Sequence, residues 1–205
     1  MAKYEIKNVV FDVGNVLVRW SPYEIVRLTF GEDVEATDMA KRIFLSDIWS
    51  SLNKGEMTET QAISRYEERL GLKKETLEVL FYYIKESLIP IYGMYELLCK
   101  LKESGYKIFA LTDNVVEIVD FLQDRYEFWQ KFDGAIVSAE VGCLKPSAEI
   151  YRKLLETYQL DGKETVFMDD VLANVKGAQD AGIHAIHFKN LFQCRQELAD
   201  LSVDI

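Results

Sequence analysis

The strongest constraint on the fold is the alternation of two kinds of segment in the second half of the chain. Short apolar segments at residues 107–112, 135–138, 165–168 and 183–188 are separated by longer amphipathic ones. Apolar runs of this length between helical patterns predict buried parallel strands joined by right-handed crossovers. Residues 6–11 have the same β-branched, apolar character and add a strand. The sequence therefore predicts an α/β protein with a doubly wound parallel sheet, covered by helices on both faces.

A long helical region separates the first predicted strand from the rest. Ser21-Pro22 places a proline at a first helical position, and Thr58-Glu-Thr-Gln61 is a capping box that opens a helix ending near Gly71. We therefore expect a small all-helical cap domain at residues 16–89, inserted after the first strand. The catalytic core is then formed by residues 1–15 and 90–205. Within this core, helices are expected at residues 94–104, about 115–129, 147–157 and 171–181.

The composition limits the classes of partner. The net charge is -10 and the pI is about 4.8, so the surface repels nucleic acid and anionic lipid. The first residues lack the apolar stretch of a signal peptide, and no apolar run approaches the length of a membrane helix. The three cysteines have neither metal-ligand spacing nor a disulfide pattern. We expect a cytoplasmic monomer or homodimer that acts on a small molecule, with no nucleic-acid or membrane partner.

Reactive side chains follow four of the predicted strands, where ligands bind in open parallel sheets. They are Asp12, then Thr112-Asp113-Asn114, then Lys145 and finally Asp169-Asp170. Carboxylates brought together from two strand ends repel one another unless a cation lies between them, and oxygen ligands near a phosphate suit Mg²⁺. Such an ion and Lys145 also provide the positive charge that a phosphoryl group needs on an acidic protein. The pattern indicates phosphoryl transfer.

These segments resemble, in order, the four motifs of the haloacid dehalogenase superfamily. They read Val-Val-Phe-Asp12-Val-Gly14-Asn15-Val, Leu-Thr112-Asp-Asn, Lys145-Pro146 and Phe-Met-Asp169-Asp170-Val-Leu-Ala-Asn174. Each motif alone is weak, but four in order at predicted strand ends are specific. The resemblance covers the whole chain, including the helical cap. The Asp-x-Gly-Asn form is similar to bacterial sugar-phosphate phosphatases of the glucose 1-phosphatase type.

The resemblance implies a Mg²⁺-dependent phosphatase that hydrolyses a small phosphorylated metabolite, such as a sugar phosphate, through an aspartyl-phosphate. The catalytic residues would be Asp12, Thr112 and Lys145. The substrate-binding residues would be Asn15, Thr112, Asp113, Asn114 and Lys145. The metal-binding residues would be Asp12, the carbonyl of Gly14, Asp169 and Asp170, with Asp169 either a ligand or a partner of the ligands. Asn174 would support the loop.

One position departs from the family pattern. Most phosphatases of the superfamily carry an Asp two residues after the nucleophile, which protonates the leaving group and then activates water, whereas this chain has Gly14. General acid help is typically a factor of about 10² to 10⁴, so its absence slows turnover of ordinary esters. Our hypothesis is that the glycine is tolerated because the leaving group is good, as the anomeric oxygen of a sugar 1-phosphate is.

Two other functions stay open at this point. A regulatory module could retain the phosphate pocket and hydrolyse poorly because Gly14 is neither acid nor base. A metal-free dehalogenase would also use Asp12 as its nucleophile, but a second acidic cluster beside an attacking carboxylate argues for a cation. Arg19 and Trp20, at the cap entrance, are candidates for substrate contact. His184 and His187 have odd spacing on a strand, so they point to opposite faces and are expected to be structural.

Overall fold

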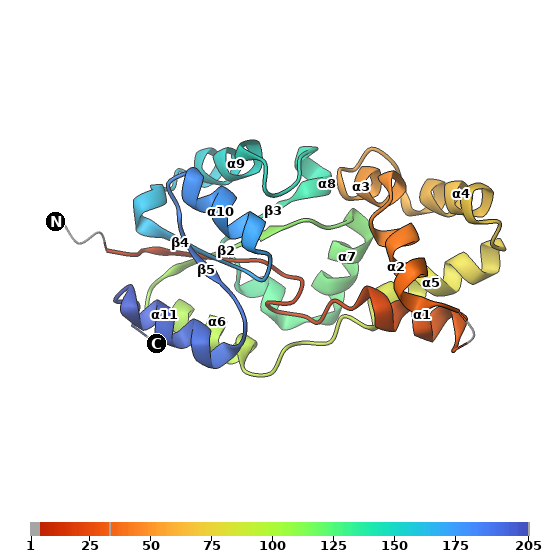
Figure 1. Cartoon of the computed structure of the whole chain (residues 1–205). Helices are drawn as coiled ribbons and strands as arrows, with labels where there is room; N and C mark the ends of the chain where they lie inside the picture. The colour runs from red at the N-terminus through yellow and green to blue at the C-terminus, as the bar shows by residue number, and fades with distance from the viewer. Residues whose placement is uncertain (1–4, 33, 205) are drawn as a thin grey trace.

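The computed structural model describes residues 5–32 and 34–204. Its described residues form one sheet of five parallel strands in the order β3-β2-β1-β4-β5 (Figure 1). The strands are β1 (Asn8–Phe11), β2 (Lys107–Thr112), β3 (Gly134–Val137), β4 (Thr165–Asp169) and β5 (His184–His187). Phe11 at the end of β1 is in register with Ala110 of β2 and Met168 of β4. The predicted doubly wound parallel sheet is confirmed.

Helices cover both faces of this sheet, as Figure 1 shows. One face packs against α6 (Met94–Glu103), α7 (Val116–Arg125) and α11 (Leu191–Asp200), and the other against α9 (Ala148–Tyr158) and α10 (Leu172–Asp180). Successive strand residues belong to different clusters: Val9 and Phe11 pack with the first set, and Val10 with the second. This alternation explains why the strands read as continuous apolar runs.

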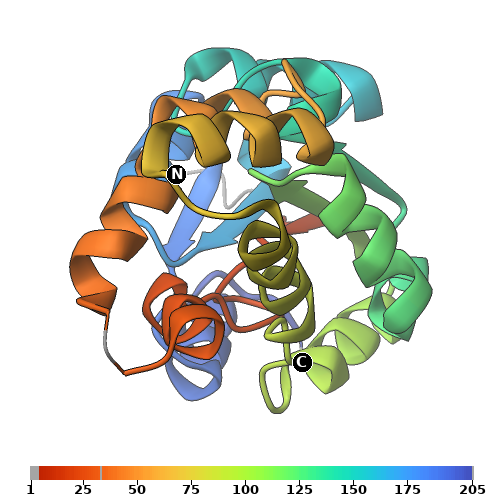
Figure 2. The same ribbon diagram turned by 90° about the vertical axis from the view of Figure 1, so that its right-hand side faces the viewer.

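Five further helices lie beyond the carboxyl ends of the strands. They are α1 (Pro22–Phe30), α2 (Ala36–Phe44), α3 (Asp47–Asn53), α4 (Glu59–Leu70) and α5 (Lys74–Glu86). Figure 2 shows them, in orange to yellow, in front of the sheet. The predicted signals are confirmed: Ser21 caps α1, and Thr58 and Gln61 form the capping box of α4. Gly71 ends α4 with a left-handed φ of 65°, a conformation that costs glycine little.

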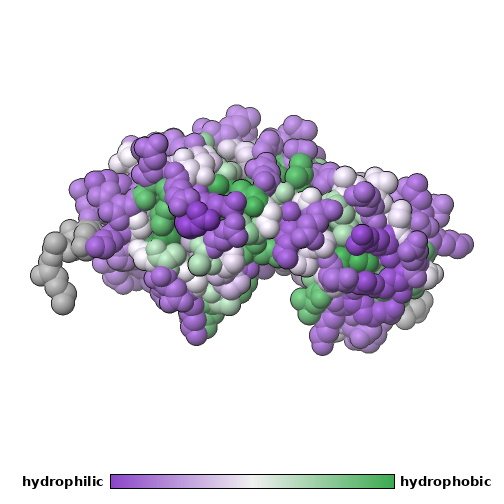
Figure 3. Space-filling view, turned by 90° about the horizontal axis from the view of Figure 1, so that it is seen from above, coloured by the Kyte–Doolittle hydropathy of each residue, from purple (hydrophilic) through white to green (hydrophobic). Residues whose placement is uncertain are grey.

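The two connections between the helical part and the sheet pair with each other. Arg19 N donates to Ile89 O at 2.9 Å, and Ile91 N donates to Leu17 O at 2.8 Å. Val18 also bridges to Pro90. The chain therefore leaves and re-enters the part that contains the sheet through one pair of adjacent segments, the neck. The domain boundaries at residues 16 and 90 stay predictions. The outline of the molecule narrows between a larger and a smaller lobe (Figure 3).

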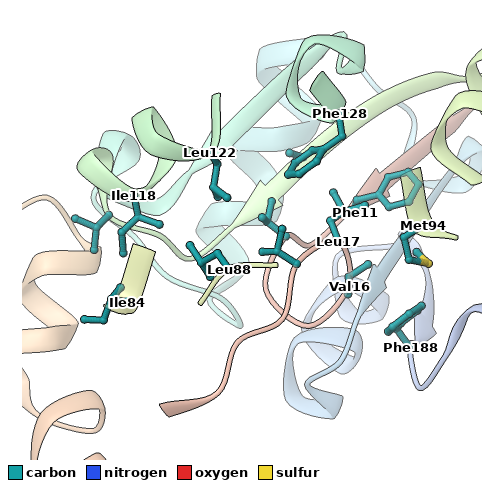
Figure 4. Close-up of a cluster of buried hydrophobic side chains, with 14 of the residues drawn as sticks. Phe11, Val16, Leu17, Ile84, Leu88, Met94, Ile118, Leu122, Phe128 and Phe188 are labelled. Atoms are coloured by element: carbon teal, nitrogen blue, oxygen red, sulfur yellow. The ribbon is translucent and has the colours of Figure 1, made fainter. Parts of the chain in front are cut away.

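Apolar packing continues across this neck. Ile84 and Leu88, from the end of α5 and the segment after it, belong to the same buried cluster as Ile118 of α7 and Leu17 (Figure 4). Because these side chains are removed from water at the junction, separating the helical part from the sheet would expose apolar surface. The position of the helices over the strand ends is thus stabilised by packing as well as by the backbone pairing.

The helix between β2 and β3 is shorter than the sequence predicts. The helix expected over about 115–129 ends at Arg125, because Tyr126 is extended and a 3₁₀ turn (Glu127–Lys131) follows. The hydroxyl of Tyr126 donates to Leu88 O at 2.8 Å, which fixes this break against the neck.

Among the described residues, no helix is both long and apolar enough to cross a membrane. The three cysteines are free thiols.

Candidate active site

The acidic residues of the first and fourth motifs meet at the carboxyl end of the sheet. Asp12 directly follows β1, and its N–H donates to Met168 O of β4 at 2.9 Å. Asp169 ends β4 and Asp170 begins the next loop. Carboxylate oxygens of these three residues, one from each, all lie within 4.8 Å of one another. Parallel pairing of β1 with β4 therefore gathers acids that are 157 or more residues apart in the sequence.

Lys145 joins this cluster from the loop before α9. Its ammonium group lies 2.9 Å from Asp12 Oδ1 and 2.7 Å from Asp169 Oδ2, and it donates to Leu111 O at 3.2 Å. Its side chain is 2% exposed. The backbone N–H of Lys145 donates to Asp113 Oδ1 at 3.0 Å, so Asp113 holds the loop that presents the ammonium. Asp113 also lines the cavity described below.

Asp169 is fully buried, and both of its carboxylate oxygens accept hydrogen bonds. Oδ1 accepts from Val171 N at 2.7 Å and from Asn174 Nδ2 at 3.1 Å, and Oδ2 accepts from Lys145 and from Asn174. Asn174 thus supports the loop as the resemblance implies. This arrangement suits a carboxylate that orients Lys145, and metal ligation by Asp169 stays a prediction.

The loop after β1 is held by Asn15, which has a left-handed φ of 53°. Asn15 Nδ2 donates to Asp170 Oδ2 at 3.1 Å, and Asn15 Oδ1 accepts from Trp20 N at 2.9 Å. The amide therefore fixes the Asp170 carboxylate and the entrance to the helical part together. Asn15 lines the cavity, but its contacts are those of a positioning residue, and its predicted role in substrate binding remains to be tested.

The second motif lies at the end of β2. Thr112 is 1% exposed, and the residues that line the cavity include its neighbours Asp113 and Asn114 but not Thr112 itself. Asn114 N donates to Ser138 Oγ at 2.9 Å, and Ser138 Oγ donates to Asn53 O at 2.6 Å. Ser138 therefore joins the strand-end loop to helix α3. The roles of Thr112 and Asn114 at a phosphate stay predictions.

The pKa values of the acidic residues and of Lys145 are shifted from their ordinary values. Burial raises the pKa of Asp12 to about 8, the Lys145 ammonium opposes this rise, and Asp169 adds to it. Burial is also the main cause that raises the pKa of Asp113 and Asp170. Burial alone would lower the pKa of Lys145, but the carboxylates of Asp12 and Asp169 outweigh it and the net direction is upward. Each shift reflects carboxyl groups crowded together in a poorly hydrated site.

A divalent cation fits this donor set. Oxygen atoms of Asp12, Asp169 and Asp170 are close enough to share an ion. Among the described residues, Lys145 contacts two of these carboxyl groups, so the acidic side chains of the cluster outnumber this lysine. Hard oxygen donors of this kind suit Mg²⁺ rather than a softer metal. The fit rests on the donor chemistry and on the excess of negative charge.

A cavity of about 550 Å³ opens above the cluster, between the strand ends and helices α2 and α3. The sheet side contributes Asp12, Gly14, Asn15, Asp113, Asn114, Lys145, Asp170 and Asn174, and the helical part contributes Phe44, Leu45, Ser46, Trp49, Ser50 and Asn53. Trp20 lines it as well, whereas Arg19 is exposed, pairs with Glu24 and is not among the lining residues. Another hollow, of about 680 Å³, lies by Lys7 and Lys107, where β1 and β2 begin.

Two contacts near the site could not be predicted from the sequence. Ser138 connects the second motif to α3, and the only local sign is a small polar residue at the end of a strand. His187 Nε2 donates to Asp170 O at 2.9 Å, so it fixes the backbone of the fourth motif from β5. The odd spacing of the histidines shows that they face opposite sides of the sheet, but it cannot indicate this contact, which depends on the pairing of β5 with β4.

Gly177 on α10 sets how closely that helix approaches the Lys145 loop. A Cβ at this position would lie 2.8 Å from Pro146 O and 2.9 Å from a ring carbon of Tyr151. Gly177→Ala must therefore shift the backbone next to Lys145, and we expect kcat of the reaction catalysed at this site to fall about 10- to 100-fold. Gln179→Ala, on an exposed position of the same helix, is the control and should keep wild-type kcat. Equal kcat values for both variants would contradict this expectation.

Comparison with known proteins agrees with this geometry. A model of haloacid dehalogenase-like hydrolases matches residues 6–182. The chain belongs to this family. It is 28% identical to a sesquiterpene phosphatase of Aspergillus oryzae over 195 residues, which cover 95% of this chain and 96% of that protein. Some other relatives are longer proteins, of which the chain spans between 18% and 36%.

Solved structures show the same fold for this haloacid dehalogenase-like hydrolase. A HAD-like family hydrolase from Porphyromonas gingivalis has a TM-score of 0.79 at 22% identity, covering 98% of this chain and 99% of that one. A HAD family enzyme from Bacteroides thetaiotaomicron, solved in complex with magnesium and inorganic phosphate, has a TM-score of 0.74 at 23% identity, covering 90% and 95%. At these identities the likeness concerns the fold.

Proposed function

We propose that this hydrolase is a Mg²⁺-dependent phosphatase of a small phosphate ester and that Asp12 is its nucleophile. The observation that carries the proposal is the convergence of Asp12, Asp170 and Lys145 at the floor of a cavity. A carboxylate beside an ammonium and a candidate cation site is suited to attack phosphorus while the phosphoryl charge is balanced. The sesquiterpene phosphatase relative and the magnesium and phosphate complex of the Bacteroides enzyme support this proposal.

The proposed chemistry proceeds in two displacements. An Asp12 carboxylate oxygen attacks phosphorus, the bond to the ester oxygen breaks, and the alcohol leaves after taking a proton from water. Water then attacks the phosphorus of the aspartyl-phosphate, the bond to Asp12 breaks, and inorganic phosphate is released. The proton that this water loses neutralises the hydroxide formed in the first step. Lys145 and Val13 N both contact Oδ1 of Asp12, at 2.9 Å and 2.7 Å, so they orient the carboxylate for attack through Oδ2.

Asp12, Asp170 and the carbonyl of Gly14 would hold the cation, with Asp169 as a further ligand or as the partner that orients Lys145. A bound Mg²⁺ supplies charge stabilisation for the transferring phosphoryl group. Asn15 keeps Asp170 in place, and Thr112 would donate a hydrogen bond to a phosphate oxygen. The remaining predicted substrate contacts, Asp113 and Asn114, border the same cavity.

Metal removal tests the proposal. We expect the enzyme to hydrolyse acetyl phosphate with Mg²⁺, to lose turnover in a chelator, and to regain it when Mg²⁺ is restored. Mg²⁺ should also raise the unfolding temperature of the wild-type protein but not that of Asp170→Asn, because ligand binding to the native state stabilises it. A folded protein that binds Mg²⁺ but does not turn over acetyl phosphate would indicate a phosphate-binding regulatory module. Turnover that persists in chelator would contradict the metal dependence.

A further inference from the structure

Above the phosphoryl site, the cavity wall is aromatic. The rings of Trp20 and Trp49 stack with centroids 5.8 Å apart and planes at 14°, and Phe44 contacts both edge-on, at 5.3 Å and 5.0 Å. All three residues line the cavity, and both tryptophans keep part of their surface exposed. Because the tryptophans already stack on each other, they form a continuous wall rather than a slot for a third ring.

Apolar side chains continue from this wall to the mouth of the cavity. Leu45, which follows α2, is 79% exposed, and Val171, from the loop before α10, is 46% exposed. Both line the cavity, on the helical and on the sheet side respectively. A single exposed leucine is ordinary on a protein surface, but two apolar residues on opposite sides of one opening, continuous with an aromatic wall, form an extended apolar track.

Two of the three polar side chains that the helical part offers to this cavity, Ser46 and Asn53, already form hydrogen bonds within the protein, and Ser50 is the third. Ser46 Oγ donates to Ile43 O at 2.7 Å and accepts from Trp49 N at 3.1 Å. Asn53 Nδ2 donates to Trp49 O at 2.8 Å. Among the described residues, α2, α3 and the turn between them contribute no charged side chain to the lining. A sugar would leave several hydroxyl groups without partners here, which is costly once water is displaced.

We infer that the alcohol released by this enzyme is apolar, a hydrocarbon chain rather than a sugar, which rests on the proposed phosphatase function. The phosphoryl group lies on the floor formed by Asp12 and Lys145. The chain runs along Trp20 and Trp49 and leaves the cavity past Leu45. Each methylene that is buried along this path adds to binding, whereas a polyol has less apolar surface to bury there.

A chain-length series tests this inference with the wild-type enzyme and Mg²⁺. Ethyl, butyl, hexyl and octyl phosphate are compared with glucose 6-phosphate, below the micelle concentration. All release primary alcohols, so the chemical step is matched. We expect kcat/KM to rise about two- to four-fold per methylene, as expected for apolar burial, and to exceed that for glucose 6-phosphate at least about 100-fold with octyl phosphate.

Two matched variants locate the effect. Leu45→Gln should flatten the dependence of kcat/KM on chain length. Leu28→Gln, on an exposed position of α1 that does not line the cavity, should keep the wild-type slope. Acetyl phosphate distinguishes failure of the proposed phosphatase function from failure of the apolar track. If the wild-type enzyme does not turn over acetyl phosphate, the phosphatase function itself is contradicted. Normal turnover of acetyl phosphate with a flat alkyl series, or with glucose 6-phosphate as the better substrate, contradicts the apolar track alone.

Discussion

Asp12→Asn will reduce kcat for every phosphate ester by at least about 10⁴-fold, a loss typical of removed nucleophiles. The amide has the same shape as the carboxylate, but its oxygen is a poor nucleophile and it carries no charge for a cation. We expect the fold to be retained, because the amide oxygen can still accept from Lys145 and Val13 N. The unfolding temperature should not fall, since the change removes one negative charge from a buried, crowded cluster.

Trapping the intermediate distinguishes nucleophilic attack from a merely supporting role. When wild-type protein is quenched in acid during turnover of a ³²P-labelled ester, label should remain on the protein and be released by hydroxylamine, as expected for an acyl phosphate. Asp12→Asn should carry no label. Mass spectrometry of the variant controls for deamidation, which would restore Asp and imitate residual activity. Label of equal amount and stability on the verified variant would show that another residue is phosphorylated.

The sheet could be predicted from the sequence because its central strands, β1, β2 and β4, are almost entirely buried and read as short apolar runs. Once the strands were identified, parallel pairing placed the residues that follow them at one edge, and the structure brings Asp12, Lys145 and Asp170 together there. The signals of the helical part were equally local: Ser21, the Thr58 capping box and Gly71 each act within a few residues.

Features that depend on contacts between distant parts of the chain could not be predicted from the sequence. The amphipathic pattern of residues 115–129 indicates which side chains are buried, and it does so equally for the helix and for the 3₁₀ turn after it. The break between them is fixed by the hydrogen bond from Tyr126 to Leu88, which lies 38 positions earlier in the sequence. The hydrogen bond from Ser138 to Asn53 spans 85 residues. By contrast, α11 has a local signal for its first turn, because the Asn190 side chain accepts from Gln193 N as the N-cap.

For the substrate as well, part of the answer follows from local motifs and part depends on contacts between distant residues. Motifs at the strand ends indicate the reaction, because phosphoryl transfer needs the same nucleophile and charges for any leaving group. In our proposal the leaving group lies against residues of α2 and α3, which the motifs do not include. In the sequence Trp20 and Trp49 are 29 positions apart, and only their stacking in the folded chain reveals a shared wall. The glucose 1-phosphatase likeness suggests a sugar phosphate, whereas this wall favours an apolar alcohol.

Gly14→Asp should supply the acid that most phosphatases of the superfamily carry and that this chain lacks. The position can accept a side chain: an added Cβ would have Trp20 Cβ as its nearest neighbour, at 3.8 Å, and the backbone is not left-handed. A carboxyl group there would border the cavity, where it can protonate a departing oxygen. We expect kcat on alkyl phosphates to rise by about 10² to 10⁴-fold, the range of general acid help.

The gain must depend on the leaving group if it comes from proton transfer. An alkoxide leaves poorly and benefits from a proton, whereas the anomeric oxygen of a sugar 1-phosphate benefits less, and acetyl phosphate needs almost no help. Gly14→Asn is the matched control, because it fills the same space and forms hydrogen bonds but cannot donate a proton in the same way. It should leave the alkyl rates near the wild-type value.

A steep dependence on leaving-group basicity in the wild-type enzyme, reduced in Gly14→Asp, would show that the glycine limits turnover of ordinary esters. Activity on sugar 1-phosphate and on alkyl phosphate that is equally unchanged by Gly14→Asp would instead mean that proton donation already occurs by another route. The same result would remove the reason to link the glycine with a good leaving group. An apolar alcohol that is more acidic than an ordinary alkanol satisfies both the aromatic wall and the missing acid.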